Sequence, residues 1–208
     1  IGKLAEANDL KGVIDQADFN DEDKLGRGKE MQDRLSKLVA IFDALDFGAN
    51  RAEGDDLLGD AYEYLIAKFA DDAGKKGGEF YTPKQVVKLM VEILRPEEGE
   101  TVYDPACGSG GMLLEATHYM ERNGLNPKSL TLYGQEKNLN TWAICKMALF
   151  LHDIDDAFLE RGDTLLDPQH LSGEKVIKRF DVVLANPPFS LSPWGHIVWS
   201  KGDPYGRD

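Results

Sequence analysis

The fold is decided by the stretch Thr101-Val102-Tyr103-Asp104-Pro105-Ala106-Cys107-Gly108-Ser109-Gly110-Gly111-Met112-Leu113-Leu114. It begins as a short apolar strand that ends on an acidic residue, turns through three glycines and continues as an apolar helix. Backbone without Cβ atoms can approach a ligand closely, and the start of a helix offers unpaired N–H groups. This order predicts a strand–turn–helix unit with a site for a nucleotide-type cofactor.

Two common phosphate-binding motifs do not fit this turn. A dinucleotide fingerprint requires a third glycine at the position of Leu113, and a Walker P-loop requires a Gly-Lys-Ser/Thr sequence that does not follow here. A purely structural turn is the alternative for an isolated glycine pair. The run over residues 104–111 is more specific than such a pair.

Beyond residue 77, short apolar runs alternate with helical periods, which is typical of a parallel sheet with crossover helices. We predict an α/β fold, a doubly wound and mostly parallel sheet. Four strands are fewer than such a sheet usually contains, so we expect the domain over residues 77–208 to be C-terminally incomplete. The predicted helices cover 83–94, 111–122 and 138–151, and the predicted strands cover 101–104, 130–134, 157–160 and 181–185.

Residues 1–76 are expected to form a partial helical N-terminal domain. Met31, Leu35, Leu38 and Phe42 recur at helical spacing and predict an amphipathic helix over 31–42. A second helix over 57–70 ends before the glycine-rich segment that places the domain boundary at 76/77. Two roles stay open for these helices: an apolar cap on the sheet, or a docking surface for a partner and DNA.

The composition fits one substantial buried core, since 42% of the 208 residues are hydrophobic and 29% are charged. No apolar run reaches 18 residues, and the N-terminus lacks the pattern of a signal peptide. We therefore expect a cytoplasmic protein without a membrane partner. No metal site is expected, because Cys107, Cys145 and the four histidines lack metal-ligand spacing.

The charge balance limits the ways in which this chain could bind nucleic acid. It has 24 basic and 37 acidic side chains, a net charge of −13. Residues 1–76 carry 11 basic and 18 acidic side chains and residues 77–208 carry 13 and 19, so neither half is basic. A protein that binds DNA by itself is normally basic. If nucleic acid is the substrate, most phosphate contacts must come from a partner, a local patch or further chain.

Acidic residues also follow the next two predicted strands. Glu136 could accept hydrogen bonds from two ribose hydroxyls, and Asp163 could accept one from an adenine amino group, because ligands of open α/β sheets bind at this edge. A solvated loop acid is the alternative for Glu136. A turn or helix-capping role is the alternative for Asp163.

The last predicted strand delivers Asn186-Pro187-Pro188-Phe189 to the same edge. The prolines have no N–H groups, so the loop presents the Asn186 amide oxygen and the Pro187 carbonyl as acceptors, with Phe189 as an aromatic face. Two acceptors and a ring can hold a planar amino group and aim its nitrogen lone pair at an electrophile. A simple proline-rich turn is the alternative.

Taken together, these residues resemble the S-adenosylmethionine-dependent amino-group methyltransferases. The closer resemblance is to the modification (M) subunit of type I restriction-modification systems, which are DNA adenine-N6 methyltransferases with a Rossmann-like fold. It rests on four segments in the family's order, over nearly the whole chain: Gly78-Glu79-Phe80-Tyr81-Thr82-Pro83, residues 104–111, residues 186–189, and Asp203-Pro204-Tyr205-Gly206-Arg207.

The resemblance implies roles for individual residues. Asn186, Pro187, Pro188 and Phe189 would receive a flipped adenine and orient its N6 toward the sulfonium methyl group. Residues 79–84 would close over the methionine end of the cofactor, Glu136 would hold the ribose, and Asp163 the adenine. The full expected cofactor site is Glu79, Phe80, Tyr81, Thr82, Pro83, Lys84, Asp104, Ala106, Cys107, Gly108, Ser109, Gly110, Gly111, Glu136 and Asp163.

The resemblance also implies partners. M subunits act on double-stranded DNA with a specificity subunit that reads the sequence, and assemble with a second M subunit and a restriction subunit. An acidic chain agrees with DNA recognition by a separate subunit. Two alternatives stay open: a methyltransferase acting on a glutamine amide or an RNA base, and a non-catalytic scaffold subunit that binds the cofactor.

Overall fold

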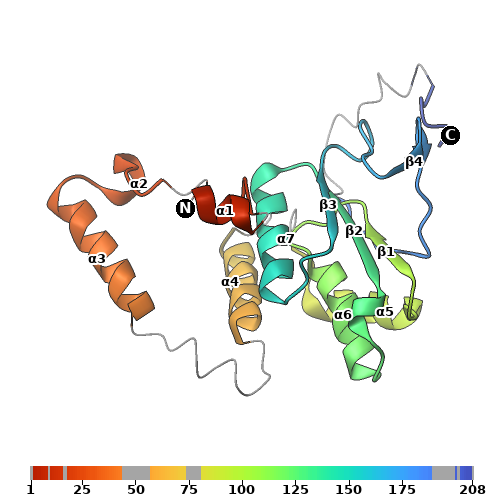
Figure 1. Ribbon diagram of the computed structural model, residues 1–208, viewed down its shortest axis with the longest axis horizontal. Coiled ribbons are helices and arrows are strands. Elements are labelled where there is room, and N and C mark those ends of the chain that lie inside the picture. Colours follow the sequence, from red (N-terminus) through yellow and green to blue (C-terminus); the bar gives the residue numbers. More distant parts are fainter. Residues whose placement is uncertain are drawn as a thin grey trace. The chain divides into compact units, whose positions relative to one another are not determined.

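The computed structural model describes residues 2–8, 10–15, 18–43, 57–73, 81–188, 200 and 202–207. The chain divides into two compact units, Ile1–Asp60 and Ala61–Asp208. Figure 1 shows the elements of both units in sequence colours. The second unit holds the sheet and every described residue of the expected site.

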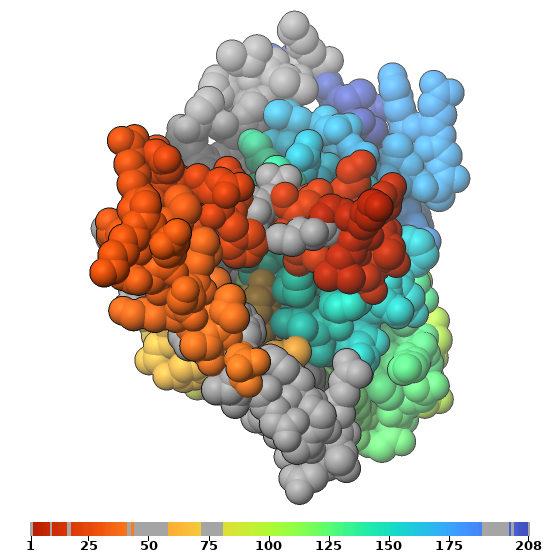
Figure 2. All heavy atoms as spheres, turned by 60° about the vertical axis from the view of Figure 1, so that its left-hand side comes forward, coloured from red at the N-terminus to blue at the C-terminus, as the bar shows by residue number. Residues whose placement is uncertain are grey.

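The first unit contains the helices α1 (Gly2–Ala7), α2 (Glu22–Leu25) and α3 (Lys29–Asp43). Asp21 caps α2 by accepting from the N–H groups of Asp23 and Lys24. Helices α2 and α3 contact each other, and Figure 2 shows residues 18–43 in orange as one body. The expected helix over 31–42 is confirmed within α3. Of its apolar face, Met31 and Leu35 are half-buried and Leu38 is exposed, and the Phe42 side chain lies outside the described part.

The main sheet has four parallel strands in the order β3-β2-β1-β6. Their bounds are β1 (Thr101–Asp104), β2 (Thr131–Glu136), β3 (Phe158–Arg161) and β6 (Val182–Val183). All four predicted strands are confirmed: β1 has the predicted bounds, and the ends of the other three are shifted by one or two residues. The strand order runs outward from β1 to β3 and then returns to the other side of β1 for β6. The order in which strands are added to the sheet therefore reverses between β1 and β6, while all four strands stay parallel.

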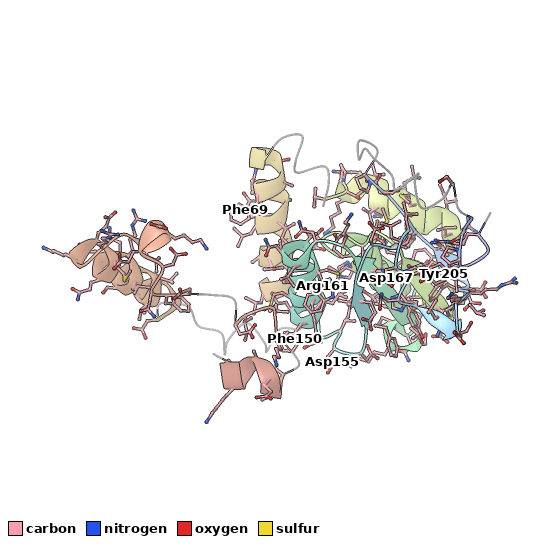
Figure 3. The ribbon with its side chains drawn as sticks, turned by 90° about the horizontal axis from the view of Figure 1, so that it is seen from above. Phe69, Phe150, Asp155, Arg161, Asp167 and Tyr205 are labelled. Carbon is pink, nitrogen blue, oxygen red and sulfur yellow. The ribbon has the colours of Figure 1, made fainter. Side chains whose placement is uncertain are left out.

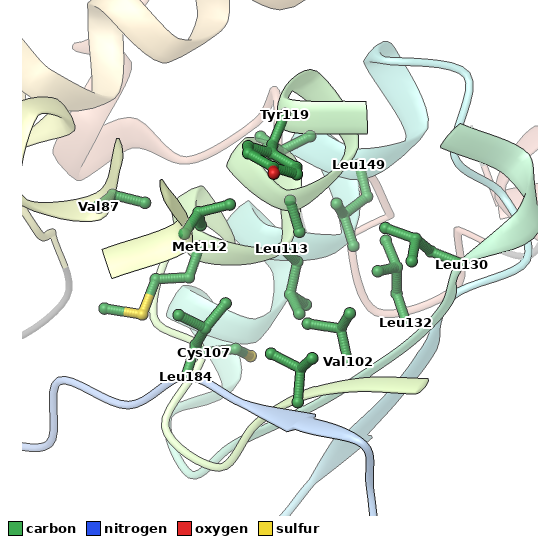
Figure 4. Close-up of a cluster of buried hydrophobic side chains, with 14 of the residues drawn as sticks. Val87, Val102, Cys107, Met112, Leu113, Tyr119, Leu130, Leu132, Leu149 and Leu184 are labelled. Atoms are coloured by element: carbon green, nitrogen blue, oxygen red, sulfur yellow. The ribbon is translucent and has the colours of Figure 1, made fainter. Parts of the chain in front are cut away.

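Helices cover one face of this sheet. The elements are α5 (Lys84–Leu94), α6 (Gly111–Arg122), a short 3-10 turn η3 (Pro127–Ser129) and α7 (Leu139–Leu151). Helix α6 contacts β1 and β2, α7 contacts β2 and β3, and α5 packs on α6. Figure 4 shows the resulting core, in which Leu113 of α6 lies among Val102, Leu132 and Leu149.

The opposite face carries aromatic side chains, because successive strand residues point to opposite sides. Tyr103 stacks on Phe180 with ring centroids 4.3 Å apart, and Tyr133 stacks on Phe158 at 4.9 Å. The buried His170 ring lies edge-on to both tyrosines and contacts the Gly134 carbonyl at 2.9 Å. The return from β3 to β6 passes along this face.

The return also contains a hairpin that the sequence did not predict, β4 (Leu171–Gly173) with β5 (Val176–Ile177). Its strands have three and two residues and no buried side chain. Strands this short carry no readable alternation of apolar and polar residues.

Helix α4 (Leu57–Ala73) lies mainly in the second unit. Its Tyr62 packs against the core, and Glu63 pairs with Lys84 of α5 at 3.1 Å. Figure 3 shows Phe69 projecting outward from this helix, where its side chain is 64% exposed. The expected domain boundary at 76/77 falls outside the described residues and stays a prediction, while the compact units divide after Asp60.

We predict that Gly110→Ala destabilises the protein by about 1–3 kcal/mol. Gly110 has a φ of +87°, and a Cβ there would lie 2.9 Å from the Cys145 sulfur on α7. Gly111→Ala is the matched control, because a Cβ at that position meets no atom within 4 Å. Urea unfolding of both variants measures the difference, and equal losses would contradict the steric explanation.

Candidate active site

A pocket that is partly open to solvent lies at the carboxyl ends of β1 and β6. This is where the strand order reverses, the usual position for ligands in open α/β sheets. The structure brings nine predicted site residues together there and adds Met112, which the sequence did not suggest. The lining is Tyr81, Thr82, Asp104, Ala106, Cys107, Gly108, Ser109, Gly111, Met112 and Asn186.

The glycine turn is held by backbone hydrogen bonds. The Cys107 N–H donates to the Gln135 carbonyl of β2 at 3.1 Å, and the Gly110 N–H donates to the Cys107 carbonyl at 2.8 Å. Gly108 and Gly110 have φ values of +54° and +87°, which favour glycine. Gly110 is also the N-cap of α6 and provides no side-chain cap. The first amides of α6 therefore start at the pocket without a side-chain acceptor from that cap.

Asp104 is the buried acid of the pocket, with 2% of its surface exposed. Burial raises the pKa of its carboxyl to about 7, and the negative charge of Glu136 adds to the rise. The Ala106 N–H, which donates to Oδ1 at 3.0 Å, opposes it. A cation bound in the pocket would lower this pKa again.

Glu136 connects the loops that follow β1 and β2. Its Oε2 accepts from the Gly108 N–H at 3.1 Å, and its Oε1 accepts from the Asn138 N–H at 2.8 Å. Both oxygens therefore position backbone. Glu136 touches the glycine turn but does not line the pocket, and its role with a ribose stays a prediction.

Asp163 holds the turn after β3. Its Oδ1 accepts from the Leu165 and Leu166 N–H groups at 3.1 and 3.2 Å, and its Oδ2 pairs with Lys137 at 2.8 Å. Burial alone would raise the pKa of Asp163, but the Lys137 ammonium and the Leu166 amide outweigh it and the pKa is lowered. The turn-capping role is thus present. A role with adenine stays a prediction, because Asp163 does not line the pocket.

Asn186 reaches the pocket from the loop after β6. Its amide nitrogen donates to the Thr82 hydroxyl at 3.0 Å, across 104 residues of sequence. Asn186 is half-buried, Pro187 is exposed and Pro188 is half-buried. The bond joins the segment before α5 to the predicted base-receiving loop.

The remaining predicted residues do not line the pocket or lie outside the described residues. Pro83 is the N-cap of α5, and the Lys84 ammonium is directed to Glu63 of α4. Gly110 lies in the turn close to α7, where a Cβ would be 2.9 Å from the Cys145 sulfur. The predicted Glu79, Phe80 and Phe189 lie outside the described residues.

Cys107 is a neutral thiol in this site. Hydrogen bonding with Cys145 and burial raise its pKa well above the ordinary value. Both cysteines are free and buried. Among the described residues, no group of three His, Cys, Asp or Glu side chains could hold a metal ion.

Sequence reasoning missed two polar contacts beside the site. The Thr164 hydroxyl donates to the Pro105 carbonyl at 2.5 Å, so the turn after β3 touches the glycine turn. Arg207 donates to carbonyls of the same turn. The resemblance of residues 203–207 to the family's motif pointed to this segment. A sequence motif alone does not indicate that Arg207 contacts the turn after β3.

Comparison with known proteins decides the family. The family model described as N-6 DNA Methylase matches residues 53–205, about three quarters of the chain. The chain belongs to the N-6 DNA methylase family. The resemblance inferred from the sequence motifs is confirmed.

Relatives of this N-6 DNA methylase family member are methylase subunits. The type I restriction enzyme MpnII methylase subunit of Mycoplasma pneumoniae is 35% identical over 201 residues, covering 92% of this chain and 36% of that protein. The crystal structure of a type I restriction-modification system methyltransferase subunit from Streptococcus thermophilus has a TM-score of 0.76 and 35% identity. It covers 90% of this chain and 39% of that one.

The fold is shared more widely. A structure from Listeria monocytogenes, described as a class I S-adenosylmethionine-dependent methyltransferase, has a TM-score of 0.56 at 16% identity and covers 89% of this chain and 52% of that one. The Rossmann-like methyltransferase fold is thereby confirmed. The chain spans less than half the length of the curated relatives that it matches. In the described part of the chain, no helix is long and apolar enough to cross a membrane.

We predict that Asp104→Asn flattens the pH dependence of stability. The pKa of Asp104 is about 7 in the folded protein, against an ordinary value of 3.8 for an aspartate exposed to water. Between these two pH values the folded protein keeps a proton that the unfolded chain has released. Stability should therefore fall as the pH rises through this window, by roughly 1 kcal/mol per pH unit. The asparagine variant lacks this contribution.

Urea unfolding of the unaltered protein and the variant near pH 5 and near pH 8 measures the effect. The difference in unfolding free energy between the two proteins should move in favour of the variant at the higher pH. Parallel pH curves would contradict a raised pKa at Asp104.

Proposed function

We propose that this member of the N-6 DNA methylase family transfers a methyl group from S-adenosylmethionine to the N6 amino group of adenine in DNA. The observation that carries the proposal is the position of Asn186. Its side chain lines the same pocket as the glycine turn, and its amide nitrogen is bonded to Thr82. A target amino group and a cofactor would therefore meet in one pocket.

The pocket residues fit S-adenosylmethionine. A Cβ at Gly111 would meet no atom within 4 Å, so the backbone there is open to close approach. The first amides of α6 favour a carboxylate, and the buried Asp104 favours a positively charged group. When bound, S-adenosylmethionine supplies an electrophilic methyl group on a sulfonium.

At the edge of this pocket we assign Glu136 to the ribose and Asp163 to the adenine of the cofactor. Glu136 already holds the Gly108 amide, so a ribose bound to it would lie against the glycine turn. Asp163 sits on a turn that touches Pro105 through Thr164. Residues 79–84 would close over the methionine end, and Tyr81 and Thr82 line the pocket from this segment.

The loop after β6 would hold the target base. With its amide nitrogen donating to Thr82, Asn186 has its amide oxygen left to accept from an exocyclic amino group. The Pro187 carbonyl provides a second acceptor without a competing N–H, and Phe189 a stacking face. Two hydrogen bonds from the amino group to these acceptors would concentrate the lone pair of its nitrogen and orient it for in-line attack. Extruding the base from the duplex costs a few kcal/mol, which binding in the pocket must offset.

The first test is a methyl-transfer assay on the full-length protein, purified with any bound partners. Labelled S-adenosylmethionine is offered together with DNA, RNA and protein, and the methylated product is identified by mass spectrometry. N6-methyladenine in DNA is the expected result. Label on a glutamine or on RNA would transfer the proposal to those substrates, and cofactor binding without any product would support a scaffold role.

We expect Asn186→Ala to abolish transfer while leaving the affinity for S-adenosylmethionine nearly unchanged. The variant removes the acceptor for the target amino group, which acts in the transition state and not in cofactor binding. Asn140→Ala, on the exposed side of α7, is the matched control. Full turnover by the Asn186 variant would exclude this side chain from the mechanism.

The partners belong to the same proposal. We assign to this chain the role of an M subunit that acts with a specificity subunit, a second M subunit and a restriction subunit. The net charge of −13 supports DNA recognition by another chain. The Streptococcus thermophilus protein is itself named as a subunit of a type I system.

The partner assignment predicts weak, sequence-independent DNA binding by the full-length protein alone. Addition of the specificity subunit should produce site-specific binding, because base contacts carry the specificity. Binding to oligonucleotides with and without the target site, at two salt concentrations, measures the sequence-independent affinity and the site-specific affinity. Tight sequence-specific binding by this chain alone would contradict the assignment.

A further inference from the structure

The tail over residues 203–207 docks on the turn that follows β3. Arg207 donates from Nη1 to the Thr164 carbonyl at 3.1 Å and from Nη2 to the Leu165 carbonyl at 2.7 Å. These contacts cross more than 40 residues of sequence. In Figure 1 the described tail, in dark blue, lies on the side of the sheet that carries the β4 hairpin.

Asp203 holds the guanidinium of Arg207 in place. Its Oδ2 accepts from Nε at 2.6 Å and its Oδ1 accepts from Nη2 at 2.9 Å, a two-point contact between two planar groups. The Asp203 side chain is fully covered and that of Arg207 is 24% exposed. The Arg207 guanidinium keeps the pKa of Asp203 well below its ordinary value, so the pair stays charged at neutral pH.

The turn that Arg207 grips is the one that carries Asp163. Arg207 binds the carbonyls of Thr164 and Leu165, while Asp163 accepts from the N–H groups of Leu165 and Leu166. The Thr164 hydroxyl fixes the same turn to Pro105 of the glycine turn. The tail, the Asp163 carboxylate and the glycine turn therefore hold this short segment from three sides.

We propose that Arg207 is a positioning residue for cofactor binding, which fixes the turn after β3 so that Asp163 is held ready for the adenine of S-adenosylmethionine. The inference rests on the proposed function, in which Asp163 receives the adenine amino group. Arg207 acts on Asp163 through the turn, whose Thr164 and Leu165 carbonyls it binds.

Arginine is suited to this task because its donors have a fixed planar arrangement. One guanidinium contacts two carbonyls and both carboxylate oxygens of Asp203 at the same time. A lysine ammonium keeps the charge but cannot reach four acceptors in one plane. Arg207→Lys therefore removes the paired hydrogen bonds to the Thr164 and Leu165 carbonyls while retaining the net charge.

The chain offers a matched control in Arg34 of α3. Its guanidinium pairs with Glu30 four residues earlier at 2.7 Å and donates to the Lys24 carbonyl at 2.8 Å. It makes the same kinds of contact as Arg207 but lies in the first unit. Arg34→Lys should leave cofactor affinity unchanged.

The test is isothermal titration calorimetry of S-adenosylhomocysteine with the full-length protein. We expect Arg207→Lys to weaken binding about tenfold, since hydrogen bonds from a charged donor to the turn are lost. In steady-state assays the KM for S-adenosylmethionine should rise while kcat at saturation stays the same. In an Asp163→Asn background, the effect of Arg207→Lys should shrink to less than about twofold, because both changes act through one turn.

Each outcome has a separate meaning. Absence of binding by the unaltered protein would overturn the proposed function and the inference with it. Normal binding by the unaltered protein and equally tight binding by Arg207→Lys would overturn the inference alone. A lower melting temperature of Arg207→Lys with unchanged affinity would also overturn it, because the tail would then stabilise the fold without positioning Asp163.

Discussion

Parallel pairing of β1 with β2 on one side and β6 on the other is the constraint on which the site depends. Asp104 is in register with Gly134, and Tyr103 with Val183, so the loops after these strands leave the sheet at one edge. A slip of one residue would exchange the two faces of β1, moving Val102 out of the core. The neighbouring β2–β3 pair is also closely packed, since a Cβ at Gly134 would lie 2.7 Å from the side chain of its β3 partner Leu159. The pocket is thus a consequence of strand order.

Two carboxylates at that edge have opposite environments. Asp104 is buried beside an acid, which favours its protonated form below about pH 7, while Glu136 is satisfied by two backbone amides. Glu136 therefore fixes the shape of the turn. Asp104 is mainly protonated below about pH 7, and a bound cation would favour its charged form. Protonation of Asp104 limits the repulsion between the two acids below about pH 7, while the proton that the folded protein keeps makes its stability decrease as the pH rises toward that value.

The regular elements could be predicted because their patterns are local. Helix α6 and strand β1 have the predicted bounds, as apolar periodicity, glycines and an acidic strand end all mark them. The pocket edge was predicted through the topology, which brings Asp104, Ser109 and Asn186 together. The β4–β5 hairpin, the Thr82–Asn186 bond and the docking of Arg207 were not predicted. The hairpin strands are too short to carry a readable alternation, and the other two depend on single contacts between residues far apart in sequence, for which no periodicity exists.

Two of those long-range contacts hold the described chain that follows β6. Asn186, three residues after the end of β6, is bonded to Thr82 in the pocket, and Arg207 is bonded to the turn after β3. Both contacts are made to segments assigned to the cofactor. A cofactor bound to these segments would therefore contact the same elements that hold Asn186 and Arg207. The two substrates of the proposed reaction would then share supporting hydrogen bonds, while the Asn186 amide oxygen, which would accept from the target amino group, acts on the base alone.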